Sequence, residues 1–406
     1  MTQFPKICLF YGFVRFQRKQ ISAINRLHIR NDCSFCPSVN INISFHRKQP
    51  YFLTSTKMFH DGFKRHSFKS MTARNSSSLS SETANEKKAA IIQSSLLKQR
   101  FIYVQTSVER WQDIPGGVFL DTAYLDSSPG DRFNPGEPVV VGLHSSPGSF
   151  YDLQPLLDAC VKSGCRVLAP SFPGHGLTEG VEKEYDDVFS HTTDEKAEFI
   201  IDFLSNLGVE RVDLLIAHGA ACYPAMQLAA GAKTSKIFKS AAFLSPWPHQ
   251  PFYAARTQKL LKLLGEMWER PFYRPLSRAL SKLIPCASQC KSLQRMTLVN
   301  TLKVVDFSEV GGFAIAMDVK KYPFVMFFAE DDSYIQSKFS YELADLMGIQ
   351  DNNIYHFTGQ LQKGQVQNFP ACFVFDKGGQ NVHQMYSGII TAVILELLNA
   401  VYPKLR

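Results

Sequence analysis

The stretch 212–229 is the part of the chain whose residue types and spacing come closest to a reactive site. An apolar run with β character, 214–217, leads within a few residues into an Ala-rich segment with helical spacing. A strand that turns so sharply into a helix is typical of a nucleophile elbow, in which small residues flank a reactive side chain at the tip. Ala217 and Ala221 supply those flanks, and the residue between them is Gly219. Because glycine has no atom with which to attack a substrate, the turn predicts a site without its nucleophile.

The elements around this turn alternate between strand and helix. Apolar runs at 138–144, 165–170, 241–245, 324–329 and 371–375 are typical of strands buried on both faces of a parallel sheet. Helical spacing lies between them, and a long amphipathic helix closes the chain. We therefore predict an α/β fold with a mostly parallel, doubly wound sheet. The segment 247–320 breaks the alternation, is rich in Lys, Arg and aromatic residues, and predicts a helical insertion.

The positive charge of the chain is concentrated at its N-terminus. The net charge of the 406 residues is +8, and residues 1–81 hold thirteen Lys and Arg against two Asp, so the extension carries +11 and the remainder −3. The folded part therefore gives no charge argument for nucleic acid. No uncharged apolar run approaches the roughly 18–20 residues that span a bilayer, so we predict no transmembrane segment. No phosphate loop follows a strand, and the only CxxC, Cys33 to Cys36, lacks a second pair at zinc spacing, so we predict neither cofactor nor metal.

The extension over residues 1–90 is Ser-rich, Arg-rich and nearly free of acids, and we expect it to be disordered or to act in targeting. This composition is that of a mitochondrial transit peptide. Two alternatives remain open: a disordered tail without a targeting signal, or translation that begins at Met58 or Met71. Either alternative leaves a cytoplasmic protein. The folded domain is expected over residues 98–406.

Four further motifs accompany the elbow, and together they resemble the α/β-hydrolase superfamily. The run 143–149 is similar to the His-Gly-x-Pro-Gly-Ser loop after the third strand, and 171–178 to the Asp-x-Pro-Gly-x-Gly-x-Ser loop after the fourth. The run 329–332 is similar to the Gly-x-x-Asp that ends the seventh strand, and 377–380 to the Gly-Gly-His before the last helix. The resemblance extends from about residue 101 to 403. It is nearest to the epoxide-hydrolase and esterase branches with a cap, and to a branch of this fold found in nematodes.

The resemblance implies a catalytic triad, of which this chain keeps one member. In active relatives an elbow side chain attacks, a histidine moves its proton and an acid orients the histidine. Asp332 occupies the acid position, Gly219 the nucleophile position and Gln380 the histidine position. A glutamine cannot accept and return a proton near neutral pH, so two of the three positions are chemically empty. Ser146 and Ala220 stand where the two oxyanion amides belong, and an amide does not depend on its side chain.

Histidines near these positions are candidates for a rescue of catalysis or for ligand contacts. His383 follows Gln380 by three residues and is a possible substitute base, or else a surface or capping histidine. We predict that the pocket is lined by residues of the two loop motifs and of the elbow, namely His144, Pro147, His175 and His218. For His144 and His175, ligand contact and loop shaping remain open, whereas His218 is expected to be structural.

Two functions follow from this site. The first is a catalytically silent α/β-hydrolase-fold protein, a pseudoenzyme, that binds a small apolar or carbonyl ligand, or a protein partner, through the inherited pocket. The N-myc downstream-regulated family resembles this case, with a glycine in its elbow. The alternative is an active hydrolase of an ester, amide or epoxide that uses a non-standard constellation, with His383 or His218 beside Asp332.

Overall fold

The computed structural model describes residues 96–106, 118–128, 136–178, 189–255, 257–284, 292–357 and 368–402. The chain divides into a unit over Met1–Lys88 and a unit over Ala89–Arg406, and the described residues all belong to the second unit. The predicted extension over residues 1–90, with its targeting interpretation and the Cys33–Cys36 pair, lies outside the described residues.

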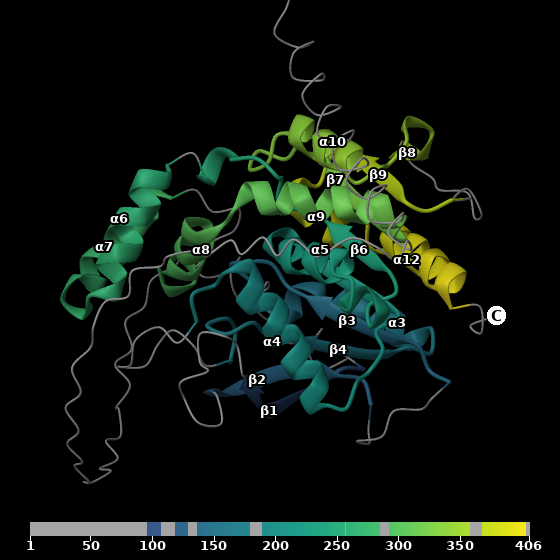
Figure 1. Ribbon diagram of the computed structural model, residues 1–406, viewed down its shortest axis with the longest axis horizontal. Helices are drawn as coiled ribbons and strands as arrows, with labels where there is room; N and C mark the ends of the chain where they lie inside the picture. Colours follow the sequence, from purple (N-terminus) through teal and green to yellow (C-terminus); the bar gives the residue numbers. More distant parts are fainter. Residues whose placement is uncertain are drawn as a thin grey trace, which may run out of the picture. The chain divides into compact units, whose positions relative to one another are not determined.

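Within these residues the second unit is built on one sheet of nine strands in the order β1-β2-β4-β3-β5-β6-β7-β9-β8 (Figure 1). β1 pairs antiparallel with β2 and β2 antiparallel with β4, and all the other pairs are parallel. The predicted fold class, a mostly parallel α/β sheet, is confirmed. The strands are β1 Lys98–Thr106, β2 Val118–Asp126, β3 Val139–Leu143, β4 Arg166–Pro170, β5 Leu214–His218, β6 Ala241–Leu244, β7 Phe324–Ala329, β8 Ile354–Phe357 and β9 Ala371–Phe375.

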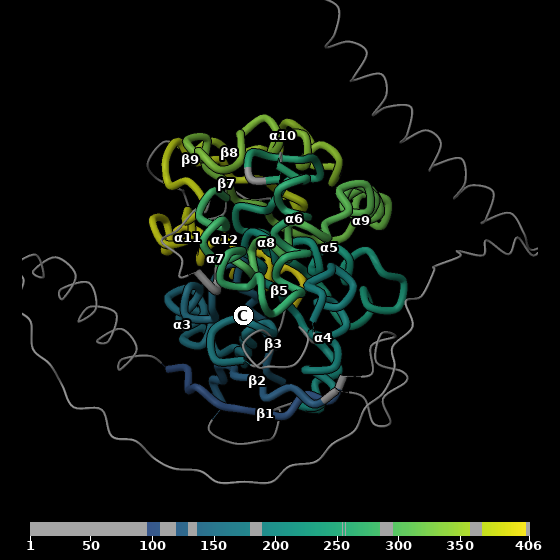
Figure 2. Tube along the Cα trace, turned by 90° about the vertical axis from the view of Figure 1, so that its left-hand side faces the viewer, coloured from purple at the N-terminus to yellow at the C-terminus, as the bar shows by residue number. Residues whose placement is uncertain are grey.

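Helices cover both faces of the sheet, which is why its central strands are apolar apart from Arg166 of β4 and His218 of β5. Every residue of β3, β4, β5, β6, β7 and β9 is buried. α3 and α12 pack together on one face, while α4, α5 and α9 follow one another on the other face and α10 packs against α9 (Figure 2). The bounds are α3 Gln154–Lys162, α4 Thr193–Asn206, α5 Cys222–Ala230, α9 Phe307–Lys320, α10 Ser337–Leu346, α11 Val382–Met385 and α12 Ser387–Val401.

Short 3-10 helices connect or extend these elements. They are η2 Phe150–Leu153, η3 Gly219–Ala221, η4 Thr234–Lys236, η5 Tyr253–Ala255, η6 Pro271–Tyr273, η7 Ser281–Leu283, η8 Asp351–Asn353 and η9 Gly379–Asn381. The closing helix α12 buries Ile390, Val393, Ile394 and Leu397 in the core. In the described part of the chain no single helix is long and apolar enough to cross a membrane, and only the bent pair 379–385 and 387–401 meets that test of length and composition jointly.

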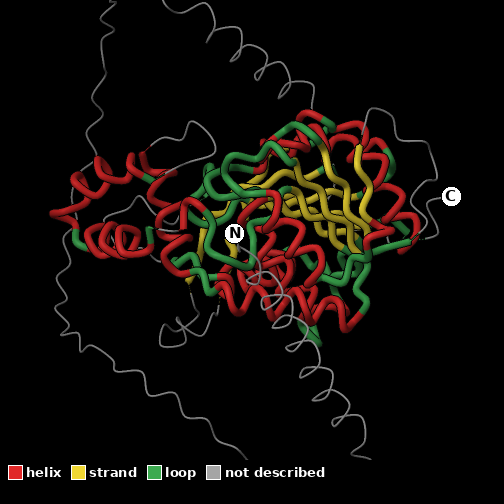
Figure 3. Tube along the Cα trace, turned by 90° about the horizontal axis from the view of Figure 1, so that it is seen from above, coloured by secondary structure: helices red, strands yellow, loops and turns green. Residues whose placement is uncertain are grey.

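The segment between β6 and β7 holds a group of helices that stands apart from the sheet. These are α6 Gln258–Glu269, α7 Arg274–Leu280 and α8 Ser292–Val304, which project beyond one end of the strands (Figures 1 and 3). The last helix of the predicted 247–320 insertion, α9, instead packs against α5 beside the sheet. The aromatic residues of this segment differ in burial: Phe252 and Trp268 are buried, whereas Phe272 is exposed.

Candidate functional site

The elbow forms where the sequence predicts it. β5 ends at His218, η3 begins at Gly219, and α5 starts three residues later at Cys222. Gly219 is buried and has a φ of +55°, in the left-handed region. A residue with a side chain pays about 1–3 kcal/mol of strain there, and glycine pays almost none. The local backbone is therefore that of a nucleophile elbow whose tip is a glycine.

A serine from a neighbouring loop fills the space above that tip. A Cβ built on Gly219 would overlap the Ser145 hydroxyl oxygen and would lie 3.0 Å from the Ser145 Cβ. The same hydroxyl accepts a hydrogen bond from the Ala220 backbone N–H, at 3.3 Å. The Ala220 amide, predicted to hold an oxyanion, is thus already bonded to a side chain. Sequence reasoning missed Ser145, although position 145 is where the resembling loop carries glycine.

The acid and the residue at the histidine position lie together. The Gln380 side-chain amide donates to the Asp332 Oδ2 at 2.5 Å. The other oxygen, Oδ1, accepts from the backbone N–H groups of Tyr334 at 2.7 Å and Ile335 at 3.0 Å. Burial raises the pKa of the Asp332 carboxyl, and these three hydrogen bonds oppose that rise. An amide that cannot carry a proton therefore holds the acid where an imidazole would be needed.

His218 and His383 form a buried pair, with ring centroids 4.4 Å apart. His218 Nε2 donates to the Gln380 backbone carbonyl at 2.9 Å, and His383 Nε2 donates to the Asp152 carbonyl at 3.2 Å. Among the described residues neither Nδ1 has a hydrogen-bond partner. Burial lowers the pKa of both imidazoles, that of His383 well below its usual value. His383 is buried rather than at the surface, and its hydrogen bond goes to Asp152 and not to Asp332.

The two loop motifs are fastened to each other by their histidines. His144 Nδ1 donates to the Ser145 carbonyl at 2.7 Å, and its Nε2 accepts from the Phe172 N–H at 3.0 Å. Both ring nitrogens thus bond to backbone, and burial lowers the pKa of His144 to about 4. This bonding fits the loop-shaping interpretation of His144. Pro147 lies in the same loop and is partly exposed.

A buried polar cluster continues from this loop to the helical insertion. His175 Nδ1 donates to the Pro173 carbonyl at 3.1 Å, which leaves Nε2 to accept from the Ser146 hydroxyl at 2.9 Å. Thr301, on α8, lies 3.5 Å from that hydroxyl and accepts from the Lys196 ammonium at 3.0 Å. Burial lowers the pKa of Lys196 to about 7 and that of His175 well below its usual value. The cluster brings two predicted site residues, Ser146 and His175, into direct contact.

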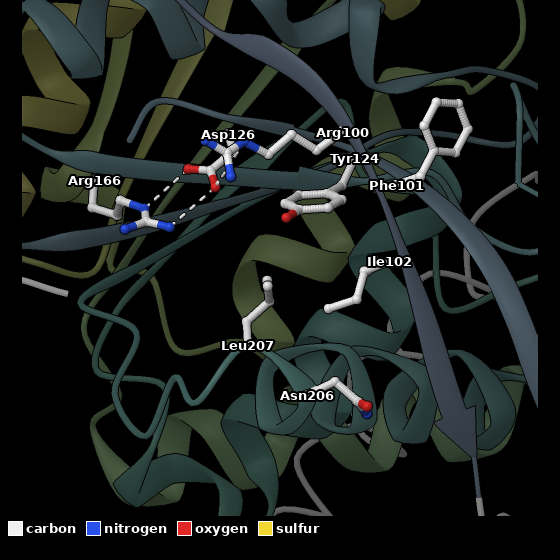
Figure 4. A pocket seen from close by; sticks show the side chains of 8 residues that line it. All are labelled: Arg100, Phe101, Ile102, Tyr124, Asp126, Arg166, Asn206 and Leu207. Carbon is white, nitrogen blue, oxygen red and sulfur yellow. Dashed lines mark hydrogen bonds and ion pairs between the residues drawn. The ribbon is translucent and has the colours of Figure 1, made fainter. Parts of the chain in front are cut away.

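A separate cleft of about 650 Å³ opens at the β1–β2 edge of the sheet and holds none of the predicted site residues. Figure 4 shows Ile102 and Leu207 on its walls below an ion pair between Asp126 and Arg166. Arg166 is buried and donates with Nη2 to Asp126 at 3.1 Å, with its Nε also 3.1 Å from that carboxylate. This pair joins β2 to β4 and gives the edge of the sheet a buried electrostatic contact.

The sheet is mostly parallel, and an elbow follows its central strand β5. Asp332 follows β7, and Gln380, which bonds to it, precedes the last helices. Together these features define a protein of hydrolase-type α/β architecture. The sequence model of the alpha/beta hydrolase family matches residues 139–350, more than half of the chain. The chain belongs to this family.

Solved structures similar to this chain are distant in sequence. A haloalkane dehalogenase loop variant from Bradyrhizobium elkanii is 13% identical, with 75% of this chain and 97% of that chain covered and a TM-score of 0.48. A carboxylesterase from Bacillus subtilis is 14% identical, with 79% and 97% covered and a TM-score of 0.46. No curated protein matches the sequence.

Proposed function

We propose that this protein is a catalytically silent member of the alpha/beta hydrolase family that binds a small apolar or carbonyl ligand, or a protein partner, beneath a cap formed by α6, α7 and α8. One observation carries the proposal: the elbow tip is Gly219, and the Ser145 hydroxyl occupies the space of the missing side chain. The Gln380 to Asp332 hydrogen bond supports it from the other side of the site. In a serine hydrolase the loss of nucleophile or base costs on the order of a million-fold in turnover.

The occupied Ala220 amide favours an apolar ligand over a carbonyl one. A ligand carbonyl would accept from this N–H only after displacing the Ser145 hydroxyl, which already accepts from it at 3.3 Å. The N-terminal end of α5 still favours partial negative charge at this point, and the serine oxygen supplies it. A ligand above the elbow therefore gains most from apolar contact with the surrounding loops and cap.

The alternative function, hydrolysis by a non-standard constellation, is favoured by one contact. Ser146 donates to His175 Nε2, and the Pro173 carbonyl fixes the tautomer in which that nitrogen is a base. Against it, attack by Ser146 would create a buried imidazolium, which desolvation disfavours together with the nearby His144, His191 and Lys196. The cost of a buried imidazolium therefore adds to the glycine at the elbow tip as a reason to place catalytic silence first.

Activity measurements on the purified full chain separate the two functions. We expect no hydrolysis of p-nitrophenyl butyrate above that of the Asp332→Ala variant, and no serine labelled by a fluorophosphonate probe. Turnover that disappears in Ser146→Ala, with the label mapped to that serine, would establish the alternative. Turnover that disappears in Asp332→Ala would overturn catalytic silence altogether.

The extension carries a separate proposal on localisation, namely import into mitochondria directed by residues 1–90. Its thirteen basic against two acidic residues over positions 1–81 support it. Residues 1–90 fused to a fluorescent protein should bring it to mitochondria, and a fusion that stays in the cytoplasm would contradict the proposal.

A further inference from the structure

The helical run Pro271–Leu283, formed by η6, α7 and η7, exposes an apolar stripe. Leu276 and Ala279 lie three residues apart on α7 and so share one side of that helix, and Phe272 of η6 and Leu283 of η7 are exposed at its two ends. Their large members are exposed, Phe272 by 87%, Leu276 by 50% and Leu283 by 66%. The stripe lies on the helical insertion, which projects from the sheet (Figure 1).

The buried side of the same run carries two serines beside the half-buried Leu280, so it is more polar than the buried side of an ordinary surface helix. Ser277 and Ser281 are fully buried, and the Ser277 hydroxyl donates to the Leu264 carbonyl of α6 at 2.8 Å. The Ser277 hydroxyl thus faces the neighbouring helix and the Ser281 hydroxyl donates to the Arg278 carbonyl of its own run, while Phe272, Leu276 and Leu283 are exposed. Contiguous apolar side chains that stay exposed in this way mark a surface that meets another apolar phase.

Basic side chains border the stripe. Arg274, Arg278 and Lys282 belong to the run, which contains no Asp or Glu. The guanidinium groups of Arg274 and Arg278 lie 5.6 and 5.8 Å from the centre of the Trp268 ring of α6. Over residues 257–284 six Lys and Arg stand against two Glu. The surface therefore combines apolar insertion groups with an excess of positive charge.

We propose that the run 271–283 docks the protein onto the surface of an anionic lipid bilayer. Phe272, Leu276 and Leu283 enter the interfacial region, and Arg278 and Lys282 meet lipid phosphates. An apolar side flanked by Lys and Arg is the pattern of helices that lie in the membrane interface, and charge complementarity selects anionic lipid. Thirteen residues are too few to span the bilayer, so the contact is peripheral. The proposal is independent of whether the elbow is catalytic.

Insertion at a single position is tested by tryptophan fluorescence in the full-length protein. Phe272→Trp places a reporter on the stripe, and Val319→Trp places a matched reporter at a 47% exposed position of α9. The three native tryptophans, Trp111, Trp247 and Trp268, are present in both proteins and give a common background. With vesicles of phosphatidylserine and brominated phosphatidylcholine we expect quenching of the reporter at position 272 and not of that at 319. Equal quenching at both positions, or none at 272, would overturn the proposal.

The electrostatic part is tested by vesicle sedimentation, in which every variant keeps the same basic extension. Each basic residue near an anionic membrane contributes about 1 kcal/mol, so Arg278→Gln with Lys282→Gln should weaken binding about thirtyfold. The control, Lys233→Gln with Lys236→Gln, removes two exposed lysines near η4 and should change nothing. Equal losses in the two double variants would show that net charge alone drives binding and would contradict docking through this run. If no variant binds vesicles, and the wild type does not bind them either, docking onto a bilayer is contradicted as well. That result is expected if the surface docks an acidic protein instead.

Discussion

The Ser145 hydroxyl lies where the first side-chain atom of residue 219 would stand. In the resembling family pattern the loop position carries glycine and the elbow tip carries the nucleophile, and this chain has the two reversed. The hydroxyl also accepts from the Ala220 N–H, so it occupies both the space of the missing side chain and the amide predicted to hold the oxyanion. The two positions are therefore coupled, because a side chain at 219 and the serine at 145 compete for one volume.

This coupling predicts non-additive stabilities. Gly219→Ala should lower the free energy of unfolding by more than the roughly 1–3 kcal/mol of left-handed strain, because the new methyl group also meets the Ser145 hydroxyl. In a Ser145→Gly background the same change should cost the strain alone. Urea unfolding of the four proteins measures the difference. Gly311→Ala on α9 is the control, since its Cβ meets nothing within 4 Å. Additive costs would contradict the competition between the two side chains.

The buried Lys196 predicts a pH-dependent stability. Burial lowers its folded-state pKa from 10.5 to about 7, so the unfolded chain binds more protons between about pH 7 and 10.5. Stability should therefore rise with pH across that window, and the full cost of burial should be present below pH 7. Lys196→Met should remove the dependence and raise the free energy of unfolding at pH 6 by roughly 2–4 kcal/mol. If wild type and variant keep a constant difference from pH 6 to 10, the lysine is not desolvated as we describe.

The His218–His383 pair predicts loss of stability in acid. Burial holds both folded-state pKa values below the ordinary 6.5, so the unfolded chain takes up protons first as the pH falls below about 6.5. Stability should fall from there, by up to about 1.4 kcal/mol per pH unit for each histidine. His383→Gln should make the fall between pH 6.5 and 5 less steep. His356→Gln, at an exposed position of β8, should leave it unchanged, and an equal effect of both would count against the buried pair.

The main elements of the fold could be predicted from local sequence because they depend on burial. β3, β7 and β9 are apolar throughout, and β5 is apolar up to its last residue, His218, since helices cover both faces of these strands, and such runs are visible in a sequence. β8 escaped notice because it is a four-residue edge strand of mixed polarity without a buried residue. The turn at Gly219 was predictable for a further reason, since small residues must flank an elbow.

A residue of the candidate site could be predicted only where a short sequence motif marks its position. Asp332 and Gln380 each follow from a short motif, and the structure brings them together. Ser145 could not be placed at the elbow from spacing, because its contact spans 75 residues and depends on how two loops meet. The sequence did hold one indication of this contact, because the chain departs from the family pattern at both positions, with serine at 145 and glycine at 219. The outward position of Phe272 could not be predicted, because only the packing of Ser277 against α6 reveals which side of the run is buried.

The central claim is that catalysis is absent because three positions have changed together. The most direct measurement is fluorophosphonate labelling of the purified wild type, of Gly219→Ser with Gln380→His, and of the same double variant with Ser145→Gly added. We predict no labelled serine in the wild type and the fastest labelling, at position 219, in the triple variant, where the elbow again has room for its side chain and the Ala220 amide is free. A wild type that labels as fast as the triple variant, and loses the label in Asp332→Ala, would contradict the account.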